Sequence, residues 1–136
     1  MAKPFNIMTK PVCGMCNLDC SYCYYTSKLR ELYPGVKNPR MSDEVLESYT
    51  RQYLQSQPQC VFGWQGGEPL LAGLAFFQKA VALQKQYCRP DQIVENALQT
   101  NGTLLDEKWC RFLATNKFLV GISLDGPAQW HDSFRR

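Results

Sequence analysis

Three closely spaced cysteines constrain this chain more than any other feature. Cys16, Cys20 and Cys23 form a C-x3-C-x2-C pattern on a short loop that follows the first apolar run. Thiols at this spacing are typical ligands of a metal ion or an iron–sulfur cluster. The chain has 7 cysteines, an odd number, and four of them lie between positions 13 and 23 (below, the cysteine loop). A secreted disulfide framework therefore fits poorly, and we expect thiolate ligands in a reducing compartment.

The composition indicates one soluble domain. The 136 residues are 45% hydrophobic, which suffices for a single core. The formal charge of +3 comes from 15 Lys and Arg against 12 Asp and Glu spread along the chain, and this argues against nucleic acid as a partner. No stretch approaches the roughly 18 apolar residues of a membrane span, and the first residues show no signal peptide. We expect a cytoplasmic protein without membrane contact.

Apolar periodicity predicts strands that alternate with helices. Strands are expected at residues 5–8, 60–65, 93–100 and 118–124. Helices are expected at 24–32, 43–57, 72–88 and from 107 onward, with Ser42 and Asp106 as N-caps. Repeats of about thirty residues in this order predict parallel strands joined by right-handed crossover helices. Four such strands do not close a barrel, so the expected fold class is α/β with an open parallel sheet.

Spacing along the helices also predicts which side chains are buried. Trp64 and Trp109 are expected in the core, while Gln84, Lys85 and Gln86 are expected to face water. The helix after Ser42 is expected to bury Val45, Leu46, Tyr49, Tyr53 and Leu54. Cys60, Cys88 and Cys110 are interpreted as small buried apolar residues, and His131 and Asp132 as part of a polar tail without a catalytic role.

Unusual residues follow the carboxyl end of each predicted strand. The cysteine loop follows the first strand and Gly66-Gly67-Glu68 the second. Gln99-Thr100-Asn101 closes the third strand, and Ser123-Leu124-Asp125 closes the fourth. In parallel α/β sheets these ends share one edge, which is where ligands bind. The sequence therefore predicts one site built from four separate segments.

Residue types alone leave two metal chemistries open. Cys13-x2-Cys16 followed by Cys20-x2-Cys23 resembles two zinc knuckles, which would make the chain a zinc-binding interaction module. Only three residues separate the two pairs, whereas zinc ribbons commonly leave a dozen or more. The competing interpretation is an iron–sulfur site held by Cys16, Cys20 and Cys23, with one corner open for reaction.

Taken together, the motifs resemble those of the radical S-adenosylmethionine (radical SAM) enzymes. The resemblance rests on the C-x3-C-x2-C loop with Tyr22 before its last cysteine and on the Gly66-Gly67-Glu68-Pro69 turn. It implies a partial (β/α) barrel in which Cys16, Cys20 and Cys23 hold a [4Fe–4S] cluster. It also implies that the fourth iron binds S-adenosylmethionine. Cys13 departs from this pattern.

Longer stretches are more specifically similar to the anaerobic sulfatase-maturating enzymes, over nearly all 136 residues. The resemblance implies that the Gly66-Gly67 backbone and Glu68 face the amino group of the cofactor. It implies that Ser123 contacts the ribose, although a strand-end hydroxyl can equally bond backbone. Gln65 and Tyr24 are candidates for contact with a peptide or for packing. The implied cofactor-binding residues are Tyr22, Gly66, Gly67, Glu68, Gln99, Asn101, Ser123 and Asp125.

The same resemblance implies a reaction and its partners. These enzymes oxidise an active-site Cys or Ser of a sulfatase to formylglycine through a 5′-deoxyadenosyl radical. The implied partners are a sulfatase polypeptide and an electron donor such as flavodoxin or ferredoxin. The family's proteins continue with more βα units and a cysteine-rich domain that carries auxiliary clusters. Residues 1–136 are therefore expected to be the N-terminal part of one radical SAM domain, not competent alone. Another radical SAM peptide-modifying enzyme is the alternative.

Overall fold

The computed structural model describes residues 4–136, apart from the side chains of residues 26, 27 and 30 of one helix. Four parallel strands form one sheet in the order β1-β2-β3-β4. They are β1 (Ile7–Thr9), β2 (Gln59–Trp64), β3 (Ile93–Thr100) and β4 (Leu119–Ile122). The expected α/β class with parallel strands is confirmed. The outer strands β1 and β4 are shorter than expected.

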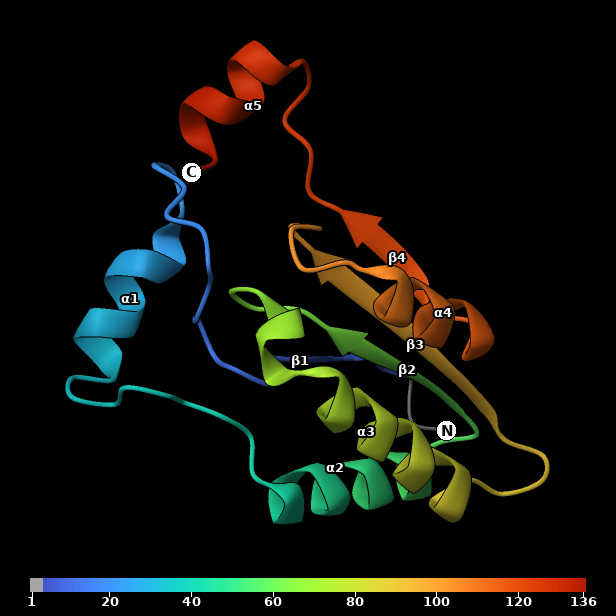
Figure 1. Cartoon of the computed structure of the whole chain (residues 1–136). Coiled ribbons are helices and arrows are strands. Elements are labelled where there is room, and N and C mark those ends of the chain that lie inside the picture. The colour runs from blue at the N-terminus through green and yellow to red at the C-terminus, as the bar shows by residue number, and fades with distance from the viewer. Residues whose placement is uncertain (1–3) are drawn as a thin grey trace.

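The helices divide into a packed group and an outlying pair (Figure 1). α2 (Asp43–Ser56), α3 (Leu74–Tyr87) and α4 (Glu107–Thr115) carry the side chains that cover one face of the sheet. α1 (Tyr24–Leu32) and α5 (Ala128–Phe134) lie near the carboxyl end of the sheet. A short 3-10 helix, η1 (Pro69–Ala72), precedes α3, because Gly73 at φ +84° interrupts the helix expected over 72–88. No helix in the described part is long and apolar enough to cross a membrane.

Both predicted N-caps are present. The Ser42 side chain accepts a hydrogen bond from the Val45 amide at 3.3 Å and begins α2. Asp106 Oδ1 accepts from the Trp109 amide at 2.8 Å and begins α4. Each cap satisfies an amide that has no partner within the helix, so the boundary follows from local sequence.

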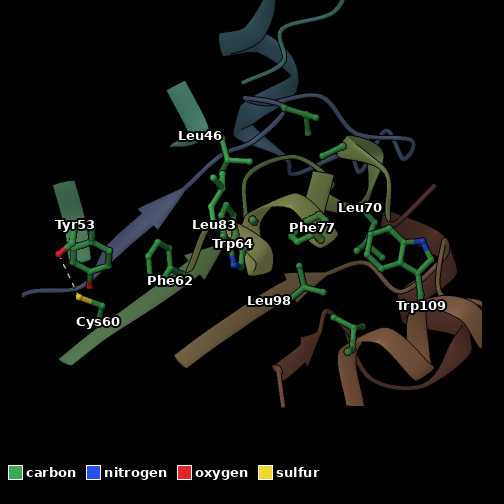
Figure 2. Packing of buried hydrophobic residues seen from close by; sticks show 14 of the residues in the cluster. Leu46, Tyr53, Cys60, Phe62, Trp64, Leu70, Phe77, Leu83, Leu98 and Trp109 are labelled. Carbon is green, nitrogen blue, oxygen red and sulfur yellow. Dashed lines mark hydrogen bonds between the residues drawn. The ribbon is translucent and has the colours of Figure 1, made fainter. Parts of the chain in front are cut away.

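The core lies between the sheet and the covering helices (Figure 2). Phe62 and Trp64 both point inward from β2, and the ring centroid of Trp64 lies 5.5 Å from that of Phe77 on α3. Leu98 of β3 and Trp109 of α4 extend the same cluster. The expected burial of both tryptophans is confirmed, since Trp64 is 1% and Trp109 7% exposed.

Two predicted helix faces are partly wrong. Val45 is exposed, and Thr50 takes a buried place on α2 because its hydroxyl donates to the Leu46 carbonyl at 2.8 Å. Gln84 is buried rather than facing water. Its amide exchanges two hydrogen bonds with the amide of Asn96 on β3, at 2.8 and 3.0 Å, and this satisfies its polar atoms inside the core.

The cysteines outside the loop and the last segment also differ from expectation. Cys60 is buried as predicted, whereas Cys88 is half-buried and Cys110 is exposed on the outer side of α4. Residues 128–134 form the helix α5 rather than a polar tail. The apolar pattern did not reveal α5 because it buries no side chain.

Candidate cofactor site

A pocket of about 140 Å³ lies at the carboxyl edge of the sheet (below, the thiol pocket). All four strand-end segments contribute to its lining, as the sequence predicted. Every predicted site residue lines it except Glu68 and Asp125. The lining residues are Cys16, Leu18, Cys20, Tyr22, Cys23, Tyr25, Gln65, Gly66, Gly67, Gln99, Thr100, Asn101, Ser123 and Arg135.

The glycine turn after β2 packs directly against the start of the cysteine loop. The Gly67 amide donates to the Cys13 carbonyl at 3.1 Å, and the Glu68 amide donates to the Met15 carbonyl at 2.6 Å. A Cβ on Gly67 would lie 1.9 Å from the Met15 carbonyl oxygen, which no side chain permits. Gly66 has φ +130°, a conformation that favours glycine. The turn therefore requires both glycines.

Glu68 is fully buried and holds two strand ends together. Its Oε1 accepts hydrogen bonds from the Leu70 amide at 2.9 Å and the Thr100 hydroxyl at 2.8 Å. Its Oε2 accepts from the Asn101 amide at 2.8 Å. Three of the roughly four acceptor positions of a carboxylate are thus occupied by protein donors. In this structure the Gly66 and Gly67 backbone lines the pocket, while the Glu68 carboxylate supports it from behind.

Amide side chains from β3 connect the walls of the pocket. Asn101 Nδ2 donates to Asn17 Oδ1 at 3.0 Å and lies 3.6 Å from the Cys16 sulfur. Gln99 Nε2 donates to the Ser123 hydroxyl oxygen at 3.0 Å, so this hydroxyl bonds a side chain of the neighbouring strand. The predicted amide pair and Ser123 therefore meet on one rim.

Tyr22, Asp125 and Arg135 form a connected polar group beside the thiols. The Tyr22 hydroxyl donates to the Asp125 carboxylate, and Arg135 Nη1 donates to the Tyr22 oxygen at 2.6 Å. Donation to Asp125 raises the pKa of Tyr22. Burial lowers the pKa of Arg135, but the hydrogen bond to Tyr22 and nearby anionic groups outweigh it, so the net pKa is raised and the guanidinium stays charged. Asp125 does not line the pocket itself but contacts two residues that do, Tyr22 and Arg135.

Sequence reasoning missed Arg135. Its contact with Tyr22 joins residues 113 positions apart, and no local motif marks it. In the sequence, Arg135 stands out only through its basic neighbour Arg136, and two adjacent arginines do not indicate a site. Gln65 lines the thiol pocket, whereas Tyr24 lines a different pocket of about 240 Å³.

The thiol pocket contains the donor set of a three-thiolate cluster. Cys16, Cys20 and Cys23 are free thiols that line it, while Cys13, at φ +55°, lines the other pocket with Lys10 and Tyr24. In the described part of the chain, no three Cys, His, Asp or Glu residues are arranged to hold a metal ion. Each thiolate of a [4Fe–4S] cluster binds a different iron, and three free thiols that line one pocket match such a cluster in number and kind.

A comparison with models of protein families identifies the family of this chain. The model of the Radical SAM superfamily matches residues 11–135. The chain belongs to the radical SAM superfamily.

Curated relatives of this radical SAM chain are anaerobic sulfatase-maturating enzymes. A serine-type enzyme of Bacteroides thetaiotaomicron is 49% identical over 137 residues, covering 99% of this chain and 33% of the relative. A cysteine-type enzyme of Clostridium perfringens is 46% identical over 134 residues, covering 98% of this chain and 36% of the relative. The chain therefore spans about a third of the length of these relatives.

Solved structures give the same picture for the fold of the radical SAM chain. It resembles native anSMEcpe with bound AdoMet (S-adenosylmethionine) with a TM-score of 0.88 and 46% identity, over 98% of this chain and 36% of that one. It resembles native anSMEcpe with bound AdoMet and Cp18Cys peptide with a TM-score of 0.87 and 44% identity, over 98% and 35%.

Proposed function

We propose that the thiol pocket binds a [4Fe–4S] cluster through Cys16, Cys20 and Cys23, with S-adenosylmethionine on the adjoining rim. The observation that carries the proposal is that these three thiols share one pocket with the Gly66-Gly67 backbone, while Cys13 lines another. When bound, the reduced cluster and the cofactor supply one-electron chemistry that ends in abstraction of a hydrogen atom from a substrate. The solved relatives hold AdoMet, and membership of the Radical SAM superfamily implies such a cluster.

The residues of this chain would position the cofactor and surround it with charged and polar groups. The glycine turn brings backbone to the pocket lining, and backbone carbonyls can accept hydrogen bonds from an ammonium group. Gln99, Asn101 and Ser123 offer amide and hydroxyl groups to the sugar and base of the cofactor.

Two predicted residues act from behind this lining. Glu68 holds the glycine turn to the end of β3 through Thr100 and Asn101. Asp125 orients Tyr22, which itself lines the pocket. We assign both to positioning the residues that touch the cofactor.

The substrate we propose is a sulfatase polypeptide whose Cys or Ser is oxidised to formylglycine. Support comes from relatives named as sulfatase-maturating enzymes of both serine and cysteine type, and from a relative that holds the Cp18Cys peptide. Gln65 lines the pocket beside the glycine turn and is the candidate for peptide contact. Electrons would come from a donor such as flavodoxin or ferredoxin.

Formation of 5′-deoxyadenosine tests the cofactor site. The chain would be reconstituted anaerobically with iron and sulfide, reduced with dithionite and mixed with S-adenosylmethionine. We expect 5′-deoxyadenosine from the wild type and Cys13→Ala, and none above background from Cys16→Ala, Cys20→Ala or Cys23→Ala. Cys110→Ala, which removes an exposed thiol far along the chain, is the matched control. Equal yields from all variants, or no iron uptake by the wild type, would refute the proposal.

A further inference from the structure

The carboxyl end of α5 lies against the cysteine loop (Figure 1). The Ser21 amide donates to the Phe134 carbonyl at 3.0 Å, and the Asp19 amide donates to the Arg136 carbonyl. Both donors lie between Cys16 and Cys23. Two backbone bonds therefore join the loop that carries the thiols to a segment more than a hundred positions away.

A side-chain contact reinforces this backbone pairing. Arg135 Nη1 donates to the Tyr22 hydroxyl oxygen at 2.6 Å and lies 3.6 Å from Asp125 Oδ1. The Arg135 side chain is only 11% exposed, although it belongs to the last residues of the chain. This hydrogen bond is charge-assisted, and it joins the covered Arg135 side chain to an exposed Tyr22.

Core packing does not account for the position of α5. The helix has seven residues and none of its side chains is buried. Isolated helices of this length are not stable in water. The described contacts of its carboxyl end are with the cysteine loop. In the middle of the helix, His131 Nδ1 accepts a hydrogen bond from the Asp125 amide at 3.3 Å.

One atom of Arg135 lacks a hydrogen-bond partner. Among the described residues, its Nε is the only buried side-chain nitrogen or oxygen in this state. Buried donors are almost always satisfied in native proteins, so an exception calls for an explanation. Arg135 lines the thiol pocket with Cys16, Cys20 and Cys23, and an anionic occupant of that pocket would supply the acceptor.

We propose that Arg135 is a positioning residue that holds the cysteine loop against α5 and so keeps Cys20 and Cys23 in place to bind a cluster. The role of Arg135 in holding the loop is inferred from contacts within this chain and does not depend on a bound cluster. Its consequence for the cluster rests on the proposed function. The two parts are tested separately.

Hydrogen exchange of the cluster-free, fully reduced chain tests the hold on the loop. Arg135→Ala is expected to speed exchange at the Asp19 and Ser21 amides about tenfold, the effect of losing one charge-assisted hydrogen bond. Arg136→Ala is the matched control, because it removes the same charge from the neighbouring, exposed side chain. Equal exchange in the wild type and both variants would overturn the proposal. The sheet core contains no residue of α5, so Arg135→Ala should keep its circular dichroism spectrum.

A double-mutant cycle shows whether Arg135 acts through Tyr22. Tyr22→Phe removes the hydroxyl that receives the Arg135 hydrogen bond and also donates to Asp125. If the two side chains work as one contact, Tyr22→Phe speeds exchange at Ser21 and the double variant exchanges no faster than Arg135→Ala. Rate increases that multiply in the double variant would contradict this coupling.

Release of iron to a chelator tests the consequence for the cluster. After reconstitution, Arg135→Ala is expected to release iron several-fold faster than the wild type, and Arg136→Ala at the wild-type rate. Equal release from Arg135→Ala and Arg136→Ala would refute the positioning role while leaving the proposed function intact. If no chain takes up iron, the proposed function fails, and hydrogen exchange still decides whether Arg135 holds the loop.

Discussion

Thr100 donates its hydroxyl hydrogen to Glu68 Oε1 at 2.8 Å, and both side chains are buried. This bond joins the turn after β2 to the end of β3, directly behind the thiol pocket. The Leu70 and Asn101 amides also donate to the Glu68 carboxylate, and these hydrogen bonds together stabilise the wall of the pocket. Such a fully satisfied buried network fixes geometry and makes each member costly to replace.

Glu68→Gln should therefore destabilise the chain although it keeps the shape of the side chain. The new NH2 group would face a protein donor, and we expect a loss of about 2–4 kcal/mol in the free energy of unfolding. Urea denaturation followed by circular dichroism measures it. Glu107→Gln, at a side chain that is 85% exposed, is the control and should change stability by less than about 0.5 kcal/mol. A loss for Glu68→Gln as small as the control's would contradict the supporting role.

Gly67→Ala should disrupt the contact between the glycine turn and the cysteine loop. The added Cβ would lie 1.9 Å from the Met15 carbonyl oxygen, so the two segments must separate. After reconstitution we expect at least a several-fold loss of bound iron. Gly14→Ala adds a methyl group to the same loop with contacts no closer than 3.5 Å, and it should keep wild-type iron content. Equal iron content in both variants would show that the close approach is unimportant.

Asn96→Ala should leave two buried donors without acceptors. Trp64 Nε1 donates to Asn96 Oδ1 at 2.8 Å, and Gln84 Nε2 donates to the same oxygen at 3.0 Å. We expect a loss of about 2–4 kcal/mol in the free energy of unfolding, measured by urea denaturation. Asn38→Ala removes an exposed amide and should be nearly neutral. The account of the buried amides is wrong if the two variants are equally stable.

Alkaline pH should weaken the fold through Tyr49. Burial raises the pKa of Tyr49 from 10.0 to about 12. Below pH 10 both folded and unfolded chains keep the proton, so this stability is fully present. Between pH 10 and 12 only the unfolded chain ionises, and the free energy of unfolding should fall by roughly 1.4 kcal/mol per pH unit from this group.

Tyr49→Phe provides the test of this alkaline effect. Its free energy of unfolding should fall less steeply than that of the wild type between pH 10 and 12, whatever its stability at neutral pH. Tyr33→Phe changes an exposed ring and should keep the wild-type slope. Parallel curves for the wild type and Tyr49→Phe would refute the effect.

Local signals predicted much of the fold and the site. Ser42 and Asp106 were found as caps because N-cap chemistry involves residues only three positions apart. The pocket could be predicted because parallel strands bring their carboxyl ends to one edge of the sheet. Gly67 and Ser123 could therefore be assigned to the same site without knowledge of any side-chain contact.

Features that depend on tertiary contacts were missed. A polar side chain such as Gln84 is expected to be exposed. Its burial depends on hydrogen bonding to Asn96, which lies on another element. Thr100 and Asn101, the partners of Glu68, lie at the end of the next strand, so the motif around Glu68 does not reveal them. Arg135 lies 113 positions from Tyr22, beyond the reach of any periodicity.

The most direct test of the cluster site is the electron paramagnetic resonance spectrum of the reduced, reconstituted chain before and after addition of S-adenosylmethionine. We predict a reduced [4Fe–4S] signal that changes shape when the cofactor binds the open iron, in the wild type and in Cys13→Ala alike. The signal should be lost in Cys16→Ala, Cys20→Ala and Cys23→Ala. A spectrum that S-adenosylmethionine does not alter, or a colourless protein that holds zinc through Cys13 and the other three thiols, would contradict the account.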